Sequence, residues 1–328
     1  MKAFITGATG FLGSKIVARL AARGDEVVAL VREESSTEAL EALGVELVRG
    51  GLDDVDGFAS ALKGCDVVYH VGARVVTHGE WDEFYATNVD ATERLIDASV
   101  SAGVSRIVHV SSLGIFEIAG DGVSLGDDAD YDHAPLLRGH YTRSKIQADR
   151  VACRAARSGA PVVVVRPGQI YGPGHPSEPV FLGRVKKFLR PSLLAVVSSP
   201  RYLVSVVYVD NAADAVVAAG TADGVEGGIF NVIDDPELDQ RTYFRALGEA
   251  RGDGLKVVYI PVGIFIPAVK AVDLLFRILK RRPWPVAHQL IRSGRSATYR
   301  TDAARETLGW TPEVSIPEGL RQSLRDAA

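Results

Sequence analysis

Two side chains able to move a proton, Tyr141 and Lys145, lie four residues apart in the stretch Tyr141–Ser158, which predicts a helix. On a helix, residues with this spacing project from the same face and lie close together. A free phenol has a pKa of about 10 and is a poor base at neutral pH, but a neighbouring ammonium favours the phenolate and lowers that pKa. The pair therefore predicts a proton-transfer site. The alternative, an exposed helix pair without function, is the usual meaning of an isolated match.

Two hydroxyls, Ser111 and Ser112, follow the apolar run that ends at Val110. In a parallel sheet, residues at the carboxyl ends of the strands face the ligand crevice. A hydroxyl there can donate to a substrate oxygen while Tyr141 handles the proton. The alternative is that the two serines only cap the turn that follows.

A glycine-rich turn with the spacing Gly7-x-x-Gly10-x-x-Gly13 lies between an apolar run, Lys2–Ile5, and an apolar-periodic stretch, Leu12–Arg23. This strand–turn–helix context is the one in which three glycines bind a dinucleotide. The first glycine permits the tight turn, the second lets the pyrophosphate approach the backbone, and the third lets the helix pack closely. The pyrophosphate would lie on the first N–H groups of the helix, which are unpaired.

The elements that must position these groups alternate between β-rich runs and helical patterns, which predicts a parallel sheet covered by helices. The predicted strands are Lys2–Ile5, Glu26–Val31, Val45–Arg49, Val67–Val71, Arg106–Ser111 and Val162–Arg166. The predicted helices are Leu12–Arg23, Thr37–Leu43, Val55–Leu62, Asn88–Ser101, Tyr141–Ser158, Val180–Leu189, Asn211–Ala219 and Thr242–Arg251. The expected fold class is α/β, a Rossmann-type doubly wound parallel sheet with a smaller, mostly helical C-terminal substrate-binding region.

The character of the chain changes after Pro167. Proline and glycine crowd residues 167–179, a composition that marks a loop or a domain seam. We therefore expect a dinucleotide-binding domain over residues 1–175, to which residues 200–235 return, and a mainly substrate-binding region over residues 176–328.

The bulk composition excludes several classes of function. The chain has 328 residues, of which 47% are hydrophobic, and a net charge of -4, which argues against nucleic acid as a partner. Its two cysteines, Cys65 and Cys153, indicate reduced thiols rather than a disulfide framework. The first residues lead straight into a predicted strand and no stretch has the length of a membrane span. We therefore expect no signal peptide and a cytoplasmic location.

Four further motifs complete a resemblance. They are Asn88–Thr92, Arg166–Gly174, Val209–Asp214 and Leu308–Pro312. Together with the glycine turn, Tyr141 and Lys145, they make nearly the whole chain resemble an extended short-chain dehydrogenase/reductase. That group includes sugar-nucleotide epimerases, dihydroflavonol reductases and 3β-hydroxysteroid dehydrogenases. No metal site is expected, and His109, within a predicted strand, is interpreted as a satisfied core residue.

The resemblance implies a role for each matching residue. Tyr141 would be the general acid/base, and Lys145 would hold the nicotinamide ribose while lowering the pKa of the tyrosine. Ser112 matches the catalytic Ser/Thr of the group, and Asn88 an asparagine that fixes the geometry of the site. The residues implied in cofactor binding are Gly7, Thr9, Gly10, Phe11, Leu12, Gly13, Arg32, Leu52, Asp53, Val71, Ala73, Tyr141, Lys145, Pro167 and Ile170.

The choice between NADP and NAD depends on the ends of the second and third predicted strands. Arg32 stands where NAD-preferring folds place an acidic residue, and a cation there suits a 2′-phosphate. This favours NADP. The alternative is that Arg32 stacks on adenine or points to solvent, and Glu33 could still reach the ribose of NAD. Related enzymes often carry Gly-Asp-Leu after the third strand, where this chain has Gly51 in place of the aspartate. We expect Asp53 to substitute for it, or the backbone of Leu52 to make the adenine contact alone.

The most apolar part of the C-terminal half is Val257–Arg282, in which residues 264–282 predict an amphipathic helix with a basic end. A core or substrate-lid helix is the first interpretation, and a helix at a membrane surface the second. The layout resembles 3β-hydroxysteroid dehydrogenases and bacterial reductases of long-chain 3-keto acids, which implies an apolar substrate. Sugar-nucleotide sites need cations for the diphosphate, but the basic cluster at residues 184–190 is interpreted as a solvated helix face.

The sequence thus predicts an NAD(P)-dependent oxidoreductase that interconverts a secondary alcohol and a ketone on a largely apolar small molecule. The first alternative is a sugar-nucleotide epimerase or dehydratase with retained NAD. The second is a non-catalytic protein that senses NADP, although such proteins typically lose the tyrosine that is kept here as Tyr141. A homodimer is common among the relatives that the resemblance implies.

Overall fold

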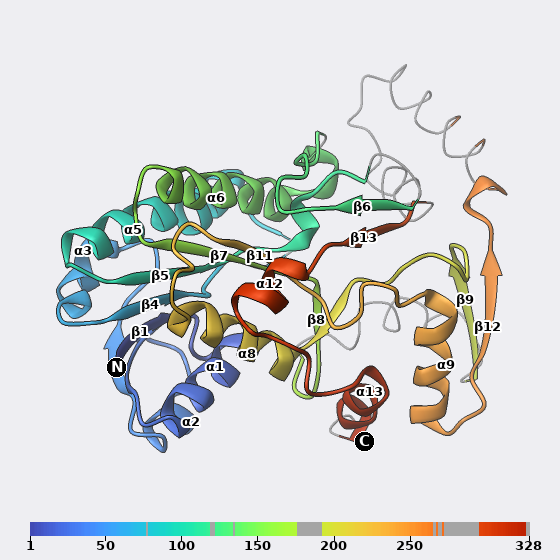
Figure 1. Ribbon diagram of the computed structural model, residues 1–328, viewed down its shortest axis with the longest axis horizontal. Coiled ribbons are helices and arrows are strands. Elements are labelled where there is room, and N and C mark those ends of the chain that lie inside the picture. Colours follow the sequence, from blue (N-terminus) through green and yellow to red (C-terminus); the bar gives the residue numbers. More distant parts are fainter. Residues whose placement is uncertain are drawn as a thin grey trace.

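The computed structural model describes residues 1–76, 78–118, 122–133, 135–175, 192–264, 267, 271 and 295–325. Its main sheet has seven parallel strands in the order β3-β2-β1-β4-β5-β7-β11 (Figure 1). The strands are β1 (Lys2–Thr6), β2 (Glu26–Val31), β3 (Glu46–Arg49), β4 (Val67–His70), β5 (Arg106–Val110), β7 (Val162–Pro167) and β11 (Ile229–Val232). The strand order reverses between β1 and β4, as in a doubly wound dinucleotide-binding sheet. The predicted fold class is confirmed.

Helices cover both faces of this sheet (Figure 1). On one face lie α1 (Phe11–Ala22) and α8 (Val209–Thr221), and on the other α3 (Val55–Phe58), α5 (Ala91–Ser101) and α6 (His140–Arg157). Successive side chains of a strand point to opposite faces, so Phe4 and Ile5, both fully buried, belong to different apolar clusters. The two-sided burial explains why these strands are continuous apolar runs.

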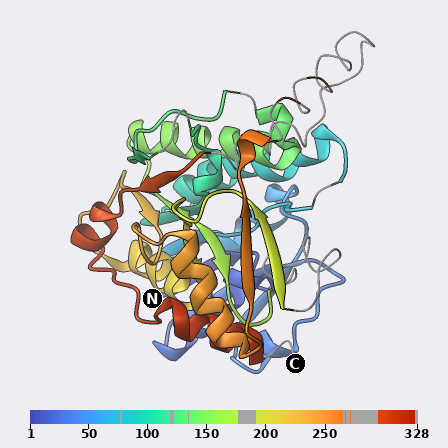
Figure 2. The same cartoon turned by 90° about the vertical axis from the view of Figure 1, so that its right-hand side faces the viewer.

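Smaller parallel sheets lie beyond the main one. The strand β9 (Leu193–Val197) pairs with β12 (Lys256–Ile260), and the helix α9 (Gln240–Arg251) stands beside them at the right of Figure 1 and in front in Figure 2. The other strands of the small sheets are β6 (Val123–Leu125), β8 (Gln169–Tyr171), β10 (Val206–Tyr208) and β13 (Ala297–Tyr299). Two helices follow them in the chain, α12 (Asp302–Thr307) and α13 (Ile316–Arg325). β10 pairs with β8, β13 pairs with β6, and α13 contacts α9.

Short turns complete the described chain. They are α2 (Glu38–Glu41), η1 (Ala59–Leu62), α4 (Trp81–Tyr85), the π-helical turn η2 (Ala86–Asp90), η3 (Leu113–Ile115), η4 (Pro135–Arg138) and η5 (Val262–Ile264). The predicted helix Asn88–Ser101 therefore begins inside η2, which follows α4 without a break. None of the helices in the described ranges is long and apolar enough to cross a membrane.

Two predicted segments fall mostly outside the described residues. The helix at 180–189 and the basic cluster at 184–190 lie there entirely. Of the segment 264–282, only Ile264, Pro267 and Ala271 are described. The interpretation of that segment as a lid or as a membrane-surface helix stays a prediction.

Candidate active site

The carboxyl ends of the central strands bring the predicted site residues to one edge of the sheet. Thr6 of β1 pairs with His70 of β4, His70 with His109 of β5, and Val110 with Val165 of β7. The glycine turn, the loop after β4 and the two serines therefore begin side by side. The ends of β2 and β3 lie at the same edge and carry Arg32, Leu52 and Asp53.

The glycine turn has a shape that fits a dinucleotide. Gly7 has a φ of +75°, and a Cβ on it would lie 2.8 Å from the Cα of Gly72. A Cβ on Gly13 would lie 2.0 Å from the carbonyl oxygen of Gly7, so α1 packs directly on the turn. Gly10 precedes α1 and offers no side-chain cap. Because Gly7, Gly10 and Gly13 carry no side chains, the turn itself leaves room for a pyrophosphate at the N–H groups that open α1, which have no partner within the helix.

The loop after β2 carries Arg32, whose side chain is 72% exposed and 3.4 Å from the carboxylate of Glu34. Arg49, at the end of β3, donates to the carbonyl oxygens of Arg32 and Glu33, each at 3.2 Å. Exposed ion pairs of this kind contribute little, so Arg32 can turn to a ligand. Arg49, which the sequence analysis missed, fixes the backbone that presents it.

The carboxylate of Asp53 stands over Gly51. Its Oδ1 lies 2.5 Å from the position that a Cβ of Gly51 would occupy. The Asp53 carboxylate therefore lies next to the place where the side chain of an aspartate at position 51 would begin, and its contact with adenine stays a prediction. Leu52 points the other way, toward the loop after β4, with its Cδ2 3.3 Å from the position of a Cβ on Gly72.

Asn88, which is 2% exposed, joins the loop after β4 to α6 from within η2. Its Oδ1 accepts from the backbone N–H of Arg74 at 2.7 Å, and its Nδ2 donates to the carbonyl of Arg74 at 3.1 Å and to the Ser144 hydroxyl at 2.9 Å. The Ser144 hydroxyl donates to the carbonyl of Tyr141 at 2.8 Å. Asn88 thus fixes the first turn of the catalytic helix through Ser144, a residue that sequence reasoning did not select.

Tyr141 is half-buried and Lys145 is 5% exposed. The Lys145 ammonium donates to the backbone carbonyl of Val110 at 2.8 Å. Burial lowers the pKa of Lys145 to about 8, against the opposing effect of the Asp149 carboxylate. Burial also raises the pKa of the Tyr141 phenol above its ordinary value. The predicted lowering of the tyrosine pKa is therefore wrong for this structure, because desolvation of the phenolate dominates and the ammonium bonds to a backbone carbonyl.

Ser112 precedes η3, and its hydroxyl oxygen accepts from the backbone N–H of Gly114 at 3.0 Å. The hydroxyl does cap the turn, but an oxygen that accepts one bond can still donate its own proton. Arg138 donates to the carbonyl of Gly114 and to the buried carboxylate of Asp132, the latter at 2.9 Å. This arginine ties the Ser112 turn to the segment that leads into Tyr141.

A buried ion pair lies behind the site. Arg166 and Asp149, with side chains 2% and 0% exposed, form two bonds, Nε–Oδ1 at 2.9 Å and Nη2–Oδ2 at 2.6 Å. The Tyr131 hydroxyl donates to the same carboxylate at 2.8 Å, and Arg166 donates to the carbonyl of Asp127 at 2.7 Å. The pair locks α6 onto β7. In the sequence, the one indication that Asp149 belongs near the site is its position four residues after Lys145, on the same face of the predicted helix.

The remaining predicted cofactor contacts also lie at this edge of the sheet. Pro167 ends β7 and is buried, and Ile170 lies in β8 and is half-buried. Val71 and Ala73 are half-buried in the loop after β4. Thr9 is exposed in the glycine turn, and Phe11 and Leu12 open α1. Their contacts with a cofactor stay predictions.

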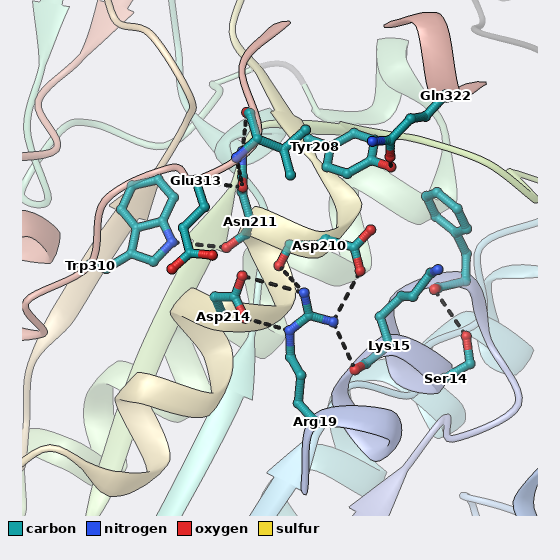
Figure 3. Close-up of polar contacts among 12 residues, drawn as sticks. Ser14, Lys15, Arg19, Tyr208, Asp210, Asn211, Asp214, Trp310, Glu313 and Gln322 are labelled. Atoms are coloured by element: carbon teal, nitrogen blue, oxygen red, sulfur yellow. Dashed lines mark hydrogen bonds and ion pairs between the residues drawn. The ribbon is translucent and has the colours of Figure 1, made fainter. Parts of the chain in front are cut away.

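The motif Val209–Asp214 forms the first part of α8, which packs against α1, the helix that follows the glycine turn (Figure 3). Arg19 of α1 donates to the carboxylate of Asp210 at 3.0 Å and also bonds to that of Asp214. The indole of Trp310 donates to the carbonyl of Asn211 at 2.8 Å. Two motifs of the resemblance thus have a structural role.

Comparison with known proteins places the chain in a family. The sequence profile of the NAD dependent epimerase/dehydratase family matches residues 3–232. The chain belongs to this family. With the glycine turn, Tyr141 and Lys145 at one edge of the sheet, it is an NAD(P)-dependent oxidoreductase of the extended short-chain dehydrogenase/reductase type.

Two curated relatives align over nearly the whole chain. One is a 4-hydroxy-2-methyl-3-oxo-4-farnesyl-3,4-dihydroquinoline-1-oxide ketoreductase of Stigmatella aurantiaca, 29% identical over 100% of this chain and 96% of its own length. The other is a 2-alkyl-3-oxoalkanoate reductase of Shewanella oneidensis, 27% identical over 98% of this chain and 84% of its own length. The crystal structure of gox2253 has the same fold, with a TM-score of 0.84 at 24% identity over 99% of this chain and 97% of that one.

Proposed function

We propose that the enzyme reduces a ketone to a secondary alcohol on a largely apolar substrate. The observation that carries the proposal is the site at the start of α6, where Arg138 ties the Ser112 turn to the segment before Tyr141. The printed names of the two relatives support the substrate class, since a farnesyl group and a 2-alkyl chain are apolar substituents next to a ketone. The apolar stretch Val257–Arg282 agrees with this class.

The residues of this chain would divide the work as follows. The glycine turn and Lys145 would hold a nicotinamide cofactor, which when bound would supply the hydride for the carbonyl carbon. The Ser112 hydroxyl donates a hydrogen bond to the carbonyl oxygen, and the Tyr141 phenol delivers the proton that this oxygen takes up. A phenol is protonated at neutral pH at its ordinary pKa of about 10, and burial raises the pKa of Tyr141 further, which suits a proton donor. The Lys145 ammonium, four residues along the same helix, would offset part of the cost that burial imposes on the phenolate that remains.

The test follows reduced nicotinamide in the purified protein with 3-ketosteroids, long-chain 3-keto acids and UDP-sugars. We expect net oxidation of the cofactor with an apolar ketone. Sugar conversion without net cofactor change would replace the proposal by the epimerase alternative. Cofactor binding without any turnover would favour the regulatory one.

Tyr141→Phe should lower turnover by at least about 100-fold, because acid–base catalysis is lost, and should change cofactor affinity far less than turnover. Tyr85→Phe is the matched control, since Tyr85 is an exposed tyrosine on α4. Turnover by Tyr141→Phe at the rate of this control would contradict the assigned role.

We propose NADP as the preferred cofactor, supported by the exposed Arg32 and the backbone that Arg49 fixes below it. Arg32→Asp should weaken NADPH affinity by about tenfold or more, because a charge-assisted contact to the 2′-phosphate is lost, and should spare NADH. Arg154→Asp is the control, since Arg154 is also an exposed arginine in a surface ion pair. An unchanged ratio of the two dissociation constants would remove Arg32 from the site.

The cellular setting of the enzyme also belongs to the proposal. We expect it in the cytoplasm, acting on a small molecule. Peripheral membrane contact through residues 264–282 and formation of a homodimer stay predictions.

A further inference from the structure

A histidine at the end of β4 has both ring nitrogens bonded in the core. His70 is 3% exposed, and its Nδ1 lies 2.9 Å from the hydroxyl of Thr6, its neighbour in register on β1. Its Nε2 lies 2.9 Å from the hydroxyl of Thr92 on α5. Burial lowers the pKa of His70 to about 3, so the ring is neutral at physiological pH and carries a single N–H.

The direction of each hydrogen bond follows from its neighbours. The Thr92 hydroxyl donates its one proton to the carbonyl of Asn88 at 2.7 Å, so it must accept from His70, whose proton is then on Nε2. The unprotonated Nδ1 accepts from the Thr6 hydroxyl. That hydroxyl in turn accepts from the backbone N–H of Gly72 at 3.0 Å. The bonds run in one direction from Gly72 to Asn88.

The two ends of this series lie at different parts of the site. At one end, Gly72 abuts Gly7, where an added Cβ would lie 2.8 Å from the Gly72 backbone. At the other end, Asn88 holds Ser144 and, through it, the first turn of α6 at Tyr141. The hydrogen-bond series therefore connects the turn that would take the pyrophosphate to the catalytic helix.

We propose that His70 is a positioning residue, whose Nε2–H tautomer holds the glycine turn through Thr6 and the Asn88–Tyr141 segment through Thr92. In this proposal, cofactor affinity depends on the hydrogen bond between His70 and Thr6, and turnover depends on the hydrogen bond between His70 and Thr92. The second half rests on the proposed function of Tyr141. The first half concerns cofactor binding alone and can fail or succeed independently of the substrate.

The neighbouring strand offers a matched control. His109 pairs with His70 in register on β5, is 1% exposed, and has its ring centroid 5.2 Å from that of His70. Within the described part of the chain, neither of its ring nitrogens has a hydrogen-bond partner, so the expectation of a satisfied core histidine is wrong on this point. Its replacement removes the same volume from the same core without breaking the series.

The experiment compares His70→Leu with His109→Leu, using the dissociation constant of NADPH, kcat and the melting temperature. We expect a lower melting temperature for His70→Leu than for His109→Leu, because only His70→Leu leaves the Thr6 and Thr92 hydroxyls without their ring partner. Binding and kcat are therefore measured well below both melting temperatures. His70→Leu alone should weaken NADPH binding and lower kcat, each by about tenfold, the effect of one lost positioning contact. An NADPH dissociation constant and kcat for His70→Leu equal to those of His109→Leu would overturn the proposal.

Two conservative variants separate the two halves. The Asn side chain can place its Oδ1 at the position of Nδ1, and the Gln side chain can place its Nε2 at the position of the ring Nε2. His70→Asn should therefore restore NADPH affinity but not kcat, and His70→Gln should restore kcat but not affinity. The same response of both variants would show that His70 acts only by filling space.

A spectroscopic measurement tests the tautomer without substrate or cofactor. With ¹⁵N-labelled histidine, one ring should show the Nε2–H pattern, and that signal should stay unchanged as the pH is lowered from neutral to about 5, two units above the lowered pKa. The signal should disappear in His70→Leu and persist in His109→Leu. A proton on Nδ1, or protonation near pH 6, would contradict the assigned hydrogen-bond direction.

Discussion

At the level of single residues, the site contains a buried positive charge, the Lys145 ammonium, although burial disfavours the charged form. Lys145 is 5% exposed, and burial lowers its pKa from the ordinary value of 10.5 to about 8. The ammonium keeps its proton at neutral pH through the carbonyl of Val110 and the nearby charge of Asp149. A charged side chain that costs folding free energy, and whose charge the proposed reaction uses, fits a catalytic rather than a structural role.

The buried ammonium predicts a rise of stability with pH. Between about pH 8 and pH 10 the unfolded chain keeps the proton of Lys145 and the folded chain releases it. The contribution of Lys145 to the free energy of unfolding should therefore rise by at most roughly 1.4 kcal/mol per pH unit in this window. The raised pKa values of the buried Cys65 and Cys153 thiols act in the opposite direction, so the effect is read as the difference between the wild type and a variant without the ammonium. Below the pKa of Lys145 in the folded state, both the folded and the unfolded chain carry the proton, so Lys145 causes no pH dependence of stability there.

Urea unfolding of the wild type and of Lys145→Met over this pH range measures the effect. The variant should lack the rise, whereas Lys63→Met, which removes an exposed lysine, should keep it. The same pH dependence in the wild type and in Lys145→Met would show that another group causes it. Lys145→Met should also abolish turnover at every pH.

At the level of elements, the sequence predicted the long regular segments well. The strands of the main sheet up to β7 appear within a residue or two of their predicted bounds. Most of them are largely apolar runs buried on two faces, whereas none of the four residues of β3 is buried. The small sheets were missed. Their partners, such as β6 with β13 and β9 with β12, are short and far apart in the sequence, so local periodicity carries no sign of the pairing.

The turn η2 shows why one element differed from its prediction. The sequence pattern Asn88–Ser101 indicates a helix, and α5 is found from Ala91 on. The π-helical turn before it widens the backbone around Asn88, whose side chain bonds to the loop after β4 and to α6. Such turns are frequent at functional sites. The irregular backbone here goes with the hydrogen bonds of Asn88 to distant segments, which helical periodicity in the sequence does not reveal.

At the level of the whole molecule, the sequence predicted which residues gather at the edge of the sheet but not what holds them there. The strand ends bring Ser112 and the glycine turn to one edge of the sheet by topology, and Lys145 ties the start of α6 to the end of β5. Arg138, Ser144 and the Arg166–Asp149 pair were missed as positioning residues, because each has a partner distant in sequence: Gly114 for Arg138, Asn88 for Ser144, and the two members of the ion pair for each other. Only the spacing of Asp149 after Lys145 gave a local signal.

The C-terminal segment shows this dependence on distant partners most clearly. Asn211, at the start of α8, is fully buried, and its Oδ1 accepts from the backbone N–H groups of Glu313 at 3.1 Å and Val314 at 3.0 Å (Figure 3). Its Nδ2 donates to the carbonyl of Val314 at 2.8 Å and to the carboxylate of Asp234 at 2.9 Å. The Asn211 side chain thus connects the segment at Glu313 and Val314 to α8, the helix that packs against α1.

Asn211→Ala should lower the free energy of unfolding by about 3 kcal/mol, because several buried partners lose their hydrogen bonds at once. Asn231→Ala is the matched control. Asn231 is 1% exposed, and its side-chain oxygen and nitrogen have no hydrogen-bond partner within the described ranges. Denaturant unfolding should show a clearly smaller loss for it, since only packing changes. Equal losses would mean that volume, not the bonds of Asn211, holds the C-terminal segment on α8.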